Sequence, residues 1–304
     1  MNRRAQATSI TMMRERVLMN HLNHDIVTDE ELKLFPCKEG AFASLISAVI
    51  SAEPGFVECV KAGGLGNHKD LQFLTGSGKK GVELKVSDSF FDADIMEWRP
   101  WEGGVQFLQG QVVSKTMAPF LGSCGLPMVA GWFEKVKALM ASLLPTFPIP
   151  TLEDYTKVVF TINAEKKLTT SAAKLIQHLR ANNEIRQKFQ DAWLLFEEEW
   201  FPTHQPNLLA FQAVLQQILG EKDYWVNINK AGAFLVEGFD LIGLRYVGTA
   251  KKPKGGVIFR YVMTLQKKKR GDTMEVPIAL KFYWKNGGQG VQNINLLCVT
   301  DPLA

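Results

Sequence analysis

The sequence predicts an α/β protein, with mixed helices and strands first, a helical middle and a β-rich, basic C-terminal region. Three observations support this order. An apolar helical run at 41–52 precedes short strands, apolar residues recur at helical spacing in the middle of the chain, and strand-like alternation dominates after residue 224. At 304 residues, with 46% hydrophobic and 22% charged residues, the chain is long enough to bury a substantial core.

The first half of the chain alternates between helical and extended patterns. Residues 1–35 are predicted to form a polar, helical segment. Pro54-Gly55 ends the next predicted helix. The predicted helices and strands that follow are a helix from about Lys38 to Ala52, a strand at 56–61, a strand at 105–113, a helix at 128–144 and a strand at 157–162.

The second half changes from helices to strands. Residues 169–200 are predicted as two helices separated near Asn182-Asn183, and a further helix spans about 207–219. The predicted strands lie at 234–236, 241–247, 257–265, 276–284 and 294–299.

Composition argues against several classes of protein. The apolar run at 41–52 is too short to cross a bilayer, and the N-terminus lacks the apolar segment of a secretory signal. The four cysteines are scattered without a CxxC pair, which argues against a zinc knuckle or a disulfide scaffold and suits a reducing compartment. We therefore expect a soluble, cytoplasmic protein that does not interact with membranes.

Positive charge is concentrated near the C-terminus. Residues 250–285 contain ten Lys/Arg and two Asp/Glu, a balance of +8 in a chain whose net charge is +4. Such asymmetry indicates a polyanionic partner, although lysines at strand ends are often simply solvated. The cationic residues of the two clusters are Lys251, Lys252, Lys254, Lys267, Lys268, Lys269 and Arg270.

A predicted β-hairpin carries the most informative polar residues. Asp70 begins the first apolar run, a glycine-rich loop at 75–81 follows, and Glu83-Leu84-Lys85 lie on the second run. Alternation places Glu83 and Lys85 on one face and directs Leu84 into the core. Folding the hairpin brings Asp70 beside Glu83, so two carboxylates and an ammonium converge, a composition that suits magnesium-dependent phosphodiester hydrolysis.

The order of Glu39 on a helix, a strand, Asp70, a turn and Glu83-Leu84-Lys85 resembles the PD-(D/E)xK nuclease superfamily, although Lys69 stands where the family name has Pro. The resemblance implies a restriction-endonuclease-like core, a central mixed sheet flanked by helices. The implied organisation is a helical arm at 1–35, a nuclease core at 36–164 and a nucleic-acid recognition region at 165–304.

The resemblance also implies roles for the polar residues. Asp70, Glu83 and the Leu84 carbonyl are expected to bind Mg²⁺, for which Mn²⁺ can substitute, and Lys85 is expected to orient or deprotonate the attacking water. Glu39 is expected to bind through water or complete a second metal site. Glu53 and Glu58 stay open as alternatives to Glu39, which is equally explained as an acidic residue in a helix's first turn.

The expected function is that of a type II restriction endonuclease, acting as a homodimer on double-stranded DNA. Lys79 and Lys80 of the hairpin loop and the two C-terminal basic clusters are the expected contacts to the phosphate backbone. Four alternatives stay open: a repair or junction-resolving nuclease, an enzyme acting on RNA, a non-catalytic nucleic-acid-binding protein, and a structural or interaction protein with no nucleic-acid role.

Overall fold

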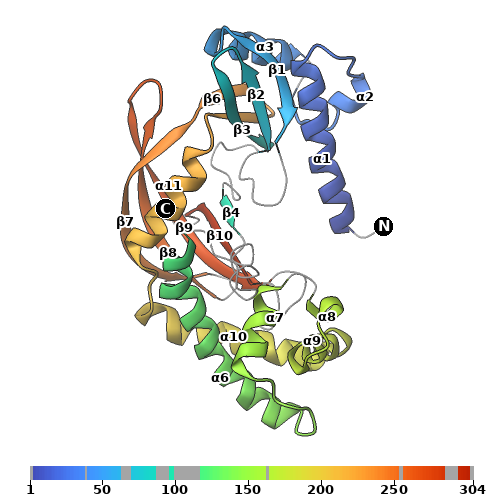
Figure 1. Ribbon diagram of the computed structural model, residues 1–304, viewed down its shortest axis with the longest axis vertical. Coiled ribbons are helices and arrows are strands. Elements are labelled where there is room, and N and C mark those ends of the chain that lie inside the picture. Colours follow the sequence, from blue (N-terminus) through green and yellow to red (C-terminus); the bar gives the residue numbers. More distant parts are fainter. Residues whose placement is uncertain are drawn as a thin grey trace. The chain divides into compact units, whose positions relative to one another are not determined.

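The chain folds into two compact units, each assembled from separate stretches of sequence. The computed structural model describes residues 3–37, 40–62, 70–86, 96–98, 117–161, 164–252, 256–284 and 294–301. Unit 1 combines residues 1–92, 216–242 and 265–274, and unit 2 contains the remainder. Segments far apart in sequence therefore share one core, and in Figure 1 the early strands of unit 1 lie beside the late strand β6.

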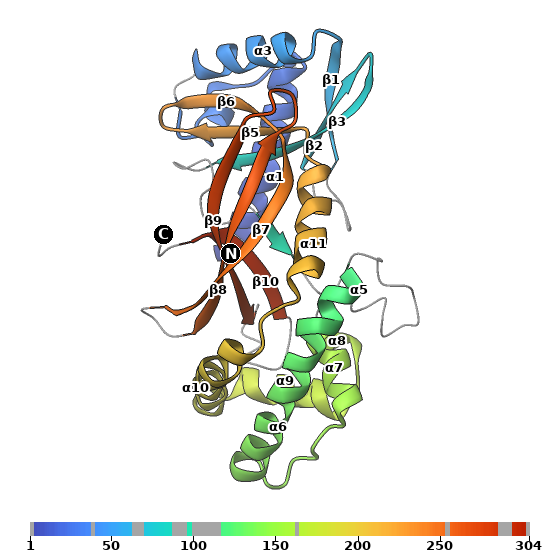
Figure 2. The ribbon, with the colours of Figure 1, turned by 90° about the vertical axis from the view of Figure 1, so that its left-hand side faces the viewer.

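Unit 1 is built on a mixed sheet with the order β1-β2-β3-β5-β6. The first three strands pair antiparallel, β3 and β5 pair parallel, and β5 pairs antiparallel with β6 (Figure 2). A parallel pair needs a long crossover connection, and here the chain between β3 and β5 includes most of unit 2. The strands are β1 (Phe56–Lys61), β2 (Leu71–Thr75), β3 (Gly78–Val86), β5 (Tyr224–Asn229) and β6 (Gly232–Glu237).

Helices flank this sheet because their apolar residues recur on one face. In α3 (Gly40–Ala52), Phe42, Leu45 and Val49 are spaced three and four residues apart and are buried. They share one core with residues of α1 (Arg3–Leu22) and with the inward-facing residues of the sheet. These sheet residues include Leu71 and Phe73 of β2, Val82 and Leu84 of β3, and Tyr224, Val226 and Ile228 of β5. The short helix α2 (Asp29–Leu32) follows α1.

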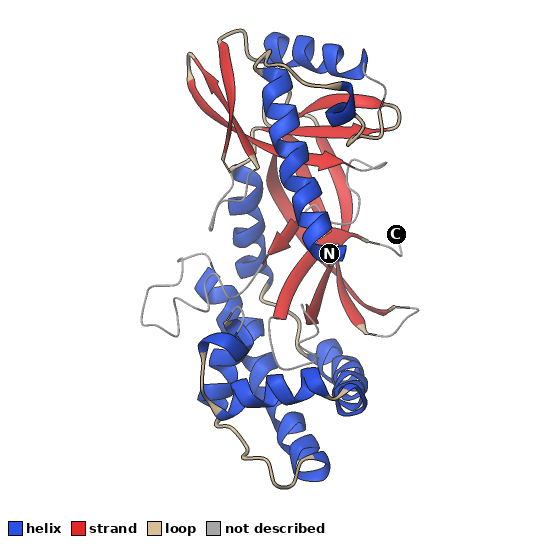
Figure 3. Ribbon diagram, turned by 90° about the vertical axis from the view of Figure 1, so that its right-hand side faces the viewer, coloured by secondary structure: helices blue, strands red, loops and turns tan. Residues whose placement is uncertain are grey.

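Unit 2 contains a group of helices that pack against one another (Figure 3). Helix α6 contacts α7 and α10, and α9 also contacts α7 and α10. Aromatic side chains join two of them, because the ring of Trp132 lies 5.2 Å from that of Trp193 between centroids. The helices are α5 (Met117–Phe120), the π-helix η1 (Leu121–Gly125), α6 (Leu126–Leu143), α7 (Leu152–Phe160), α8 (Ala164–Lys167), α9 (Ser171–Ala181), α10 (Asn183–Trp200), the 3₁₀-helix η2 (Phe201–Thr203) and α11 (Leu208–Gly220), whose last residues belong to unit 1.

A second sheet has the strand order β4-β10-β9-β8-β7 and lies mostly in unit 2. The residues between 265 and 274, where β8 ends and β9 begins, belong to unit 1. The strands are β4 (Met96–Trp98), β7 (Phe239–Lys251), β8 (Val257–Lys267), β9 (Thr273–Trp284) and β10 (Ile294–Thr300). None of the described helices combines the length and the apolar character that a bilayer crossing requires.

The structure confirms most predicted elements and corrects three predictions. The predicted strand at 157–162 is wrong, because these residues lie largely in helix α7. The hairpin turn is shorter than predicted, so Lys79 and Lys80 belong to strand β3 rather than to a loop. Strand β5 was not predicted as a separate strand. The predicted strand at 105–113 lies outside the described residues.

Candidate active site

The β2–β3 hairpin brings Asp70 next to Glu83. The antiparallel pairing of β2 with β3 extends to Leu71 and Val82. Asp70 comes just before β2, and its backbone N–H donates to the Val82 carbonyl oxygen at 3.1 Å. The Asp70 carboxylate is held in place by the backbone N–H of Leu84, which donates to Oδ2 at 2.9 Å. The Asp70 carboxyl therefore lies beside β3, where the charge of Glu83 acts on it.

Glu83 is bound by two lysines. Lys85 lies two residues further along the same strand and therefore on the same face, and its Nζ is 2.8 Å from Oε1 of Glu83. Lys222 is 2.9 Å from the other oxygen, Oε2. Glu83 and Lys222 are buried, whereas the side chain of Lys85 keeps 20% of its surface exposed. Each carboxylate oxygen of Glu83 thus has its own ammonium partner.

Lys222, which lies just before strand β5, carries no signal in the sequence that marks it as part of this site. The parallel pairing of β3 with β5 carries it to Glu83. The adjacent Asp223 accepts a hydrogen bond from the Gly81 N–H at 2.7 Å and donates its own N–H to the Gly81 carbonyl at 2.8 Å. Residues 81 and 223 are 142 positions apart, so no local sequence pattern could have indicated this contact.

Two further residues, Lys268 and Gly238, hold the backbone around Lys222 in place. The Lys268 ammonium donates to the carbonyl oxygens of Gly220 and Lys222, at 2.8 and 2.9 Å. Gly238 packs so closely that an added Cβ would overlap the Lys222 carbonyl oxygen and lie 2.7 Å from that of Asp223. Position 238 therefore requires glycine for lack of space, and the loop that carries Lys222 has little freedom to move.

Burial and charge set the ionisation of the two carboxylates. Burial and the neighbouring charge of Glu83 together raise the pKa of Asp70 to about 6, against the opposing effects of the hydrogen bond from Leu84 and the charge of Lys85. Burial would also raise the pKa of Glu83, but the ammonium groups of Lys222 and Lys85 outweigh it and hold that pKa below its usual range. The site therefore pairs a firmly ionised carboxylate with one that ionises less readily.

Strand β5 adds two buried side chains to the same face. The parallel register sets Trp225 beside Glu83 and Asn227 beside Lys85, and both are almost fully buried. The Lys222 Nζ lies 4.8 Å from the centroid of a Trp225 ring, within cation–π range. The Nδ2 of Asn227 is buried without a hydrogen-bond partner among the described residues, which is unusual for a buried amide.

Asp70 and Glu83 are the carboxylates of this site that could hold a hard divalent cation. Mg²⁺ in proteins is commonly bound by one or two carboxylates with waters completing an octahedron. Asp70 and Glu83 offer the carboxylates. In a strand, the N–H and C=O of one residue point to the same side. Because the N–H of Leu84 donates to Asp70, the carbonyl of Leu84 also points to the side of β3 on which Asp70 lies. No cluster of three or more His, Cys, Asp or Glu side chains able to hold a metal occurs in the described part of the chain.

Neither Glu53 nor Glu58 forms a hydrogen bond or ion pair with Asp70 or Glu83 among the described residues. Glu39 falls outside the described residues. Glu53, at the end of α3, instead accepts hydrogen bonds from Tyr224 and Lys269, and Glu58 is exposed on β1. The upstream acid whose charge does reach Asp70 is Glu15 of α1, which raises the pKa of that carboxyl further.

Nothing in the sequence distinguishes Glu15 from the other acids of the N-terminal segment. Its side chain is 12% exposed, and it pairs with Lys61 of β1 at 3.1 Å.

The basic residues of the hairpin lie on opposite faces of β3. Lys79 is exposed and, by alternation, shares the face of Glu83 and Lys85. Lys80 lies on the other face, paired in register with the core residue Phe73, and its charge helps to lower the pKa of Glu53. A DNA contact by Lys79 is compatible with this placement, whereas Lys80 faces the α3 side.

The first C-terminal basic cluster is partly engaged in unit 2. Lys251 pairs with Glu198 at 2.7 Å, and the charge of Lys252 acts on the buried Glu197. Lys254 lies outside the described residues. DNA contacts by this cluster stay a prediction.

Comparisons with protein-family models, with curated proteins and with solved structures found no match to this chain.

Proposed function

We propose that the protein is a metal-dependent endonuclease that hydrolyses DNA phosphodiester bonds. The observation that carries the proposal is that the Asp70 carboxylate is bonded to the Leu84 N–H, next to Glu83, and that Lys85 is bound to Glu83 on the same strand. The order of helix α3, the antiparallel strands β1 to β3 and the parallel strand β5 gives a mixed sheet flanked by helices, which supports a restriction-endonuclease-like core in unit 1.

The proposed chemistry assigns each side chain one task. Asp70, Glu83 and the Leu84 carbonyl would hold Mg²⁺ or Mn²⁺, which when bound neutralises phosphate charge and acidifies a water. Lys85 reaches solvent with part of its side chain, and it would orient the attacking water or hold its proton. Lys222 keeps Glu83 ionised and oriented from the buried side.

The test is cleavage of supercoiled plasmid with Mg²⁺, with and without EDTA. Asp70→Asn keeps the size of the side chain but removes its charge, so we expect cutting to be lost while salt-sensitive DNA binding persists. Asp191→Asn, at an exposed position of α10, removes the same charge elsewhere and should cut like the wild type. Equal activity of the Asp70→Asn protein would remove Asp70 from the mechanism.

The particular function we propose is that of a type II restriction endonuclease, acting as a cytoplasmic homodimer with one site per DNA strand. Digestion of a fully sequenced phage genome should then give discrete fragments whose ends share one sequence. A smear, or preferential cutting of branched DNA, would instead favour a repair or junction-resolving nuclease.

A second candidate function is non-catalytic nucleic-acid binding. The observation in its favour is that both oxygens of Glu83 already have lysine partners, so a metal would have to share or displace them. This function predicts DNA retention that is independent of Mg²⁺ and no cleavage under any metal condition.

A further inference from the structure

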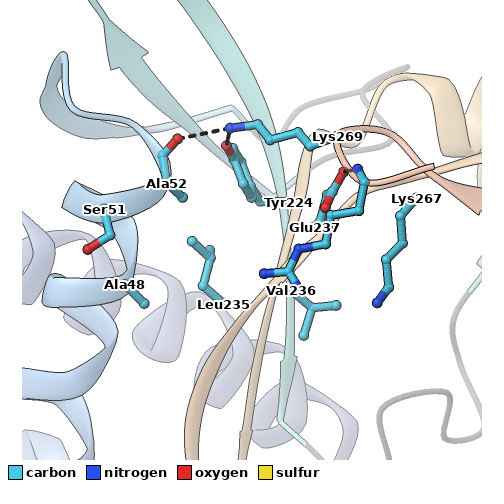
Figure 4. Close-up of a pocket in the computed structure, with 10 residues that line it drawn as sticks. Ala48, Ser51, Ala52, Tyr224, Leu235, Val236, Glu237, Lys267 and Lys269 are labelled. Carbon is cyan, nitrogen blue, oxygen red and sulfur yellow. Dashed lines mark hydrogen bonds between the residues drawn. The ribbon is translucent and has the colours of Figure 1, made fainter. Parts of the chain in front are cut away.

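A pocket of about 570 Å³ lies within unit 1 and is lined from α3, β5, β6, the end of β8 and the residues that follow it (Figure 4). Glu83 is not among its lining residues. Its lining includes three cations from one short segment, Lys267, Lys269 and Arg270, and one acid, Glu237. The remaining wall is largely apolar, with Leu235 among its residues. The second basic cluster of the sequence therefore surrounds a concave site rather than a flat surface.

Lys269 has a structural role in this pocket. Its Nζ donates to the carbonyl oxygen of Ala52 at 2.9 Å, to Oε1 of Glu53 at 3.0 Å and to the hydroxyl of Tyr224. Figure 4 shows the side chain reaching across to Ala52 and Tyr224. Ala52 is the last residue of α3, where the helix dipole favours a positive charge. The charge of Lys269 is thus compensated by Glu53 and by the helix end.

Lys268 is also engaged within the protein, since it donates to the carbonyl oxygens of Gly220 and Lys222. The two other cations of the cluster are differently placed. Lys267 Nζ is 3.8 Å from Oδ2 of the largely exposed Asp272, a weak and exchangeable pair.

Arg270 is exposed and uses its backbone N–H, at 3.1 Å, to bond Glu237. Among the described residues no hydrogen bond or ion pair holds its guanidinium.

The charges of the pocket suit a phosphate group. Three cations line it against one lining acid, Glu237, and of these cations Lys269 is paired with Glu53 whereas Lys267 has only the long contact to Asp272. A DNA phosphodiester carries one negative charge. The guanidinium fork of an arginine binds phosphate oxygens in pairs, and a lysine adds a point charge.

We propose that this pocket binds one backbone phosphate of DNA, with Lys267 and Arg270 as its ligands. The proposal rests on the proposed nuclease function and narrows the predicted DNA contacts of the cluster from four residues to two. Lys268 and Lys269 hold the surrounding backbone in place.

The test is fluorescence anisotropy of a DNA duplex in EDTA, where no cleavage occurs, over a series of salt concentrations. Loss of one phosphate contact lowers the slope of log K against log salt by about 1. The double variant Lys267→Gln/Arg270→Gln should show this smaller slope and roughly tenfold weaker binding, because it loses one phosphate contact. Arg186→Gln/Lys188→Gln removes the same charge from α10 and should keep the slope of the wild type.

The outcomes distinguish the phosphate-pocket assignment from the nuclease proposal on which it rests. If the wild type cuts plasmid and the double variant binds DNA with an unchanged slope, the pocket assignment is overturned and the nuclease proposal stands. An equal loss in the α10 control would also overturn it, because the effect would be one of net charge. If inorganic phosphate raises the melting temperature of the wild type alone while the DNA slope is unchanged, the pocket takes free phosphate instead of DNA. A wild type that neither binds nor cuts DNA overturns both.

Discussion

At the scale of single residues, Glu83 organises the candidate site, because it is a buried carboxylate with an ammonium at each oxygen. Removing charges from water costs several kcal/mol per ion, so such a cluster is stable only while every member keeps its partner. The hairpin pattern was sufficient to find Asp70, Glu83 and Lys85, since alternation alone defines their face. It could not find Lys222, whose contact depends on a strand far along the chain.

Removal of the Lys222 charge should therefore destabilise the fold. We expect Lys222→Met to lower the free energy of unfolding by about 3 kcal/mol, because it leaves the buried Glu83 with Lys85 alone. Urea denaturation measures this change. The matched control is Lys188→Met, which breaks an exposed pair with Glu184 on α10 and should cost less than about 0.5 kcal/mol. Equal losses in the two variants would contradict the proposed burial of the Lys222–Glu83 pair.

A second buried carboxyl, Glu197 in unit 2, makes stability depend on pH. Its oxygens accept hydrogen bonds from Trp193 Nε1 at 2.9 Å and from the Val257 N–H at 3.0 Å, yet burial raises its pKa to about 7 against these bonds and the charge of Lys252. The folded state then binds the proton more tightly than the unfolded chain, whose carboxyl has its ordinary pKa near 4.5. Stability is therefore lost as pH rises from about 4.5 to about 7.

Glu197→Gln should remove this pH dependence, because the amide cannot ionise. Relative to the variant, the wild type should lose about 3 kcal/mol of unfolding free energy between pH 5 and pH 8, at 1.36 kcal/mol per pKa unit. Urea denaturation of both proteins across this range gives the difference, and a difference that does not change with pH would contradict the expectation. Glu199→Gln removes the same charge from an exposed position of α10 and serves as the control.

At the scale of elements, sequence patterns predicted the secondary structure correctly where they agreed with one another. They failed where a helix pattern and a strand pattern competed. The run Lys157 to Ile162 is rich in β-branched residues and therefore predicted a strand. The stronger signal was the helix start, since Thr151 caps α7 by accepting a hydrogen bond from the Asp154 N–H at 3.1 Å. Strand β5 was missed for another reason. It pairs with β3, which lies far away in the sequence, so the residues next to β5 in the chain do not indicate the pairing.

The junction between β6 and β7 offers a test of how elements are held together. Gly238→Ala would place a Cβ against the carbonyls of Lys222 and Asp223, so we expect a loss of about 1–3 kcal/mol or more in unfolding free energy. Thermal or urea unfolding measures the loss. Gly76→Ala, where an added Cβ meets nothing within 4 Å, should change stability by less than about 1 kcal/mol. A silent Gly238→Ala variant would show that the loop carrying Lys222 can move.

At the scale of the whole molecule, the chain is interleaved, because each unit draws on three stretches of sequence. The predicted organisation into consecutive segments at 1–35, 36–164 and 165–304 followed composition, which changes along the chain. Composition cannot report that β5 and β6 rejoin the sheet of β1 to β3 after the intervening helices. The described fold class, a mixed sheet flanked by helices, was nevertheless accessible from the sequence.

The interleaving predicts how a truncated protein behaves. A fragment ending at residue 164 lacks Tyr224, Val226 and Ile228, which complete the apolar core of unit 1 beside β3. We expect this fragment to show no cooperative thermal transition by circular dichroism and no protected amides in β3, whereas the full chain shows both. A cooperative transition in the fragment would mean that the first stretch of unit 1 is stable without β5.

The parallel pairing of β3 with β5 also has a consequence during protein synthesis. Val82 and Tyr224 are register partners, and the neighbouring contact between Gly81 and Asp223 spans 142 positions. At translation speeds of about 5–20 residues per second, the nascent hairpin waits on the order of ten seconds for its partner strand to leave the ribosome. Throughout that interval a strand bearing the candidate catalytic residues has an unsatisfied edge, which makes early chaperone association advantageous for this chain.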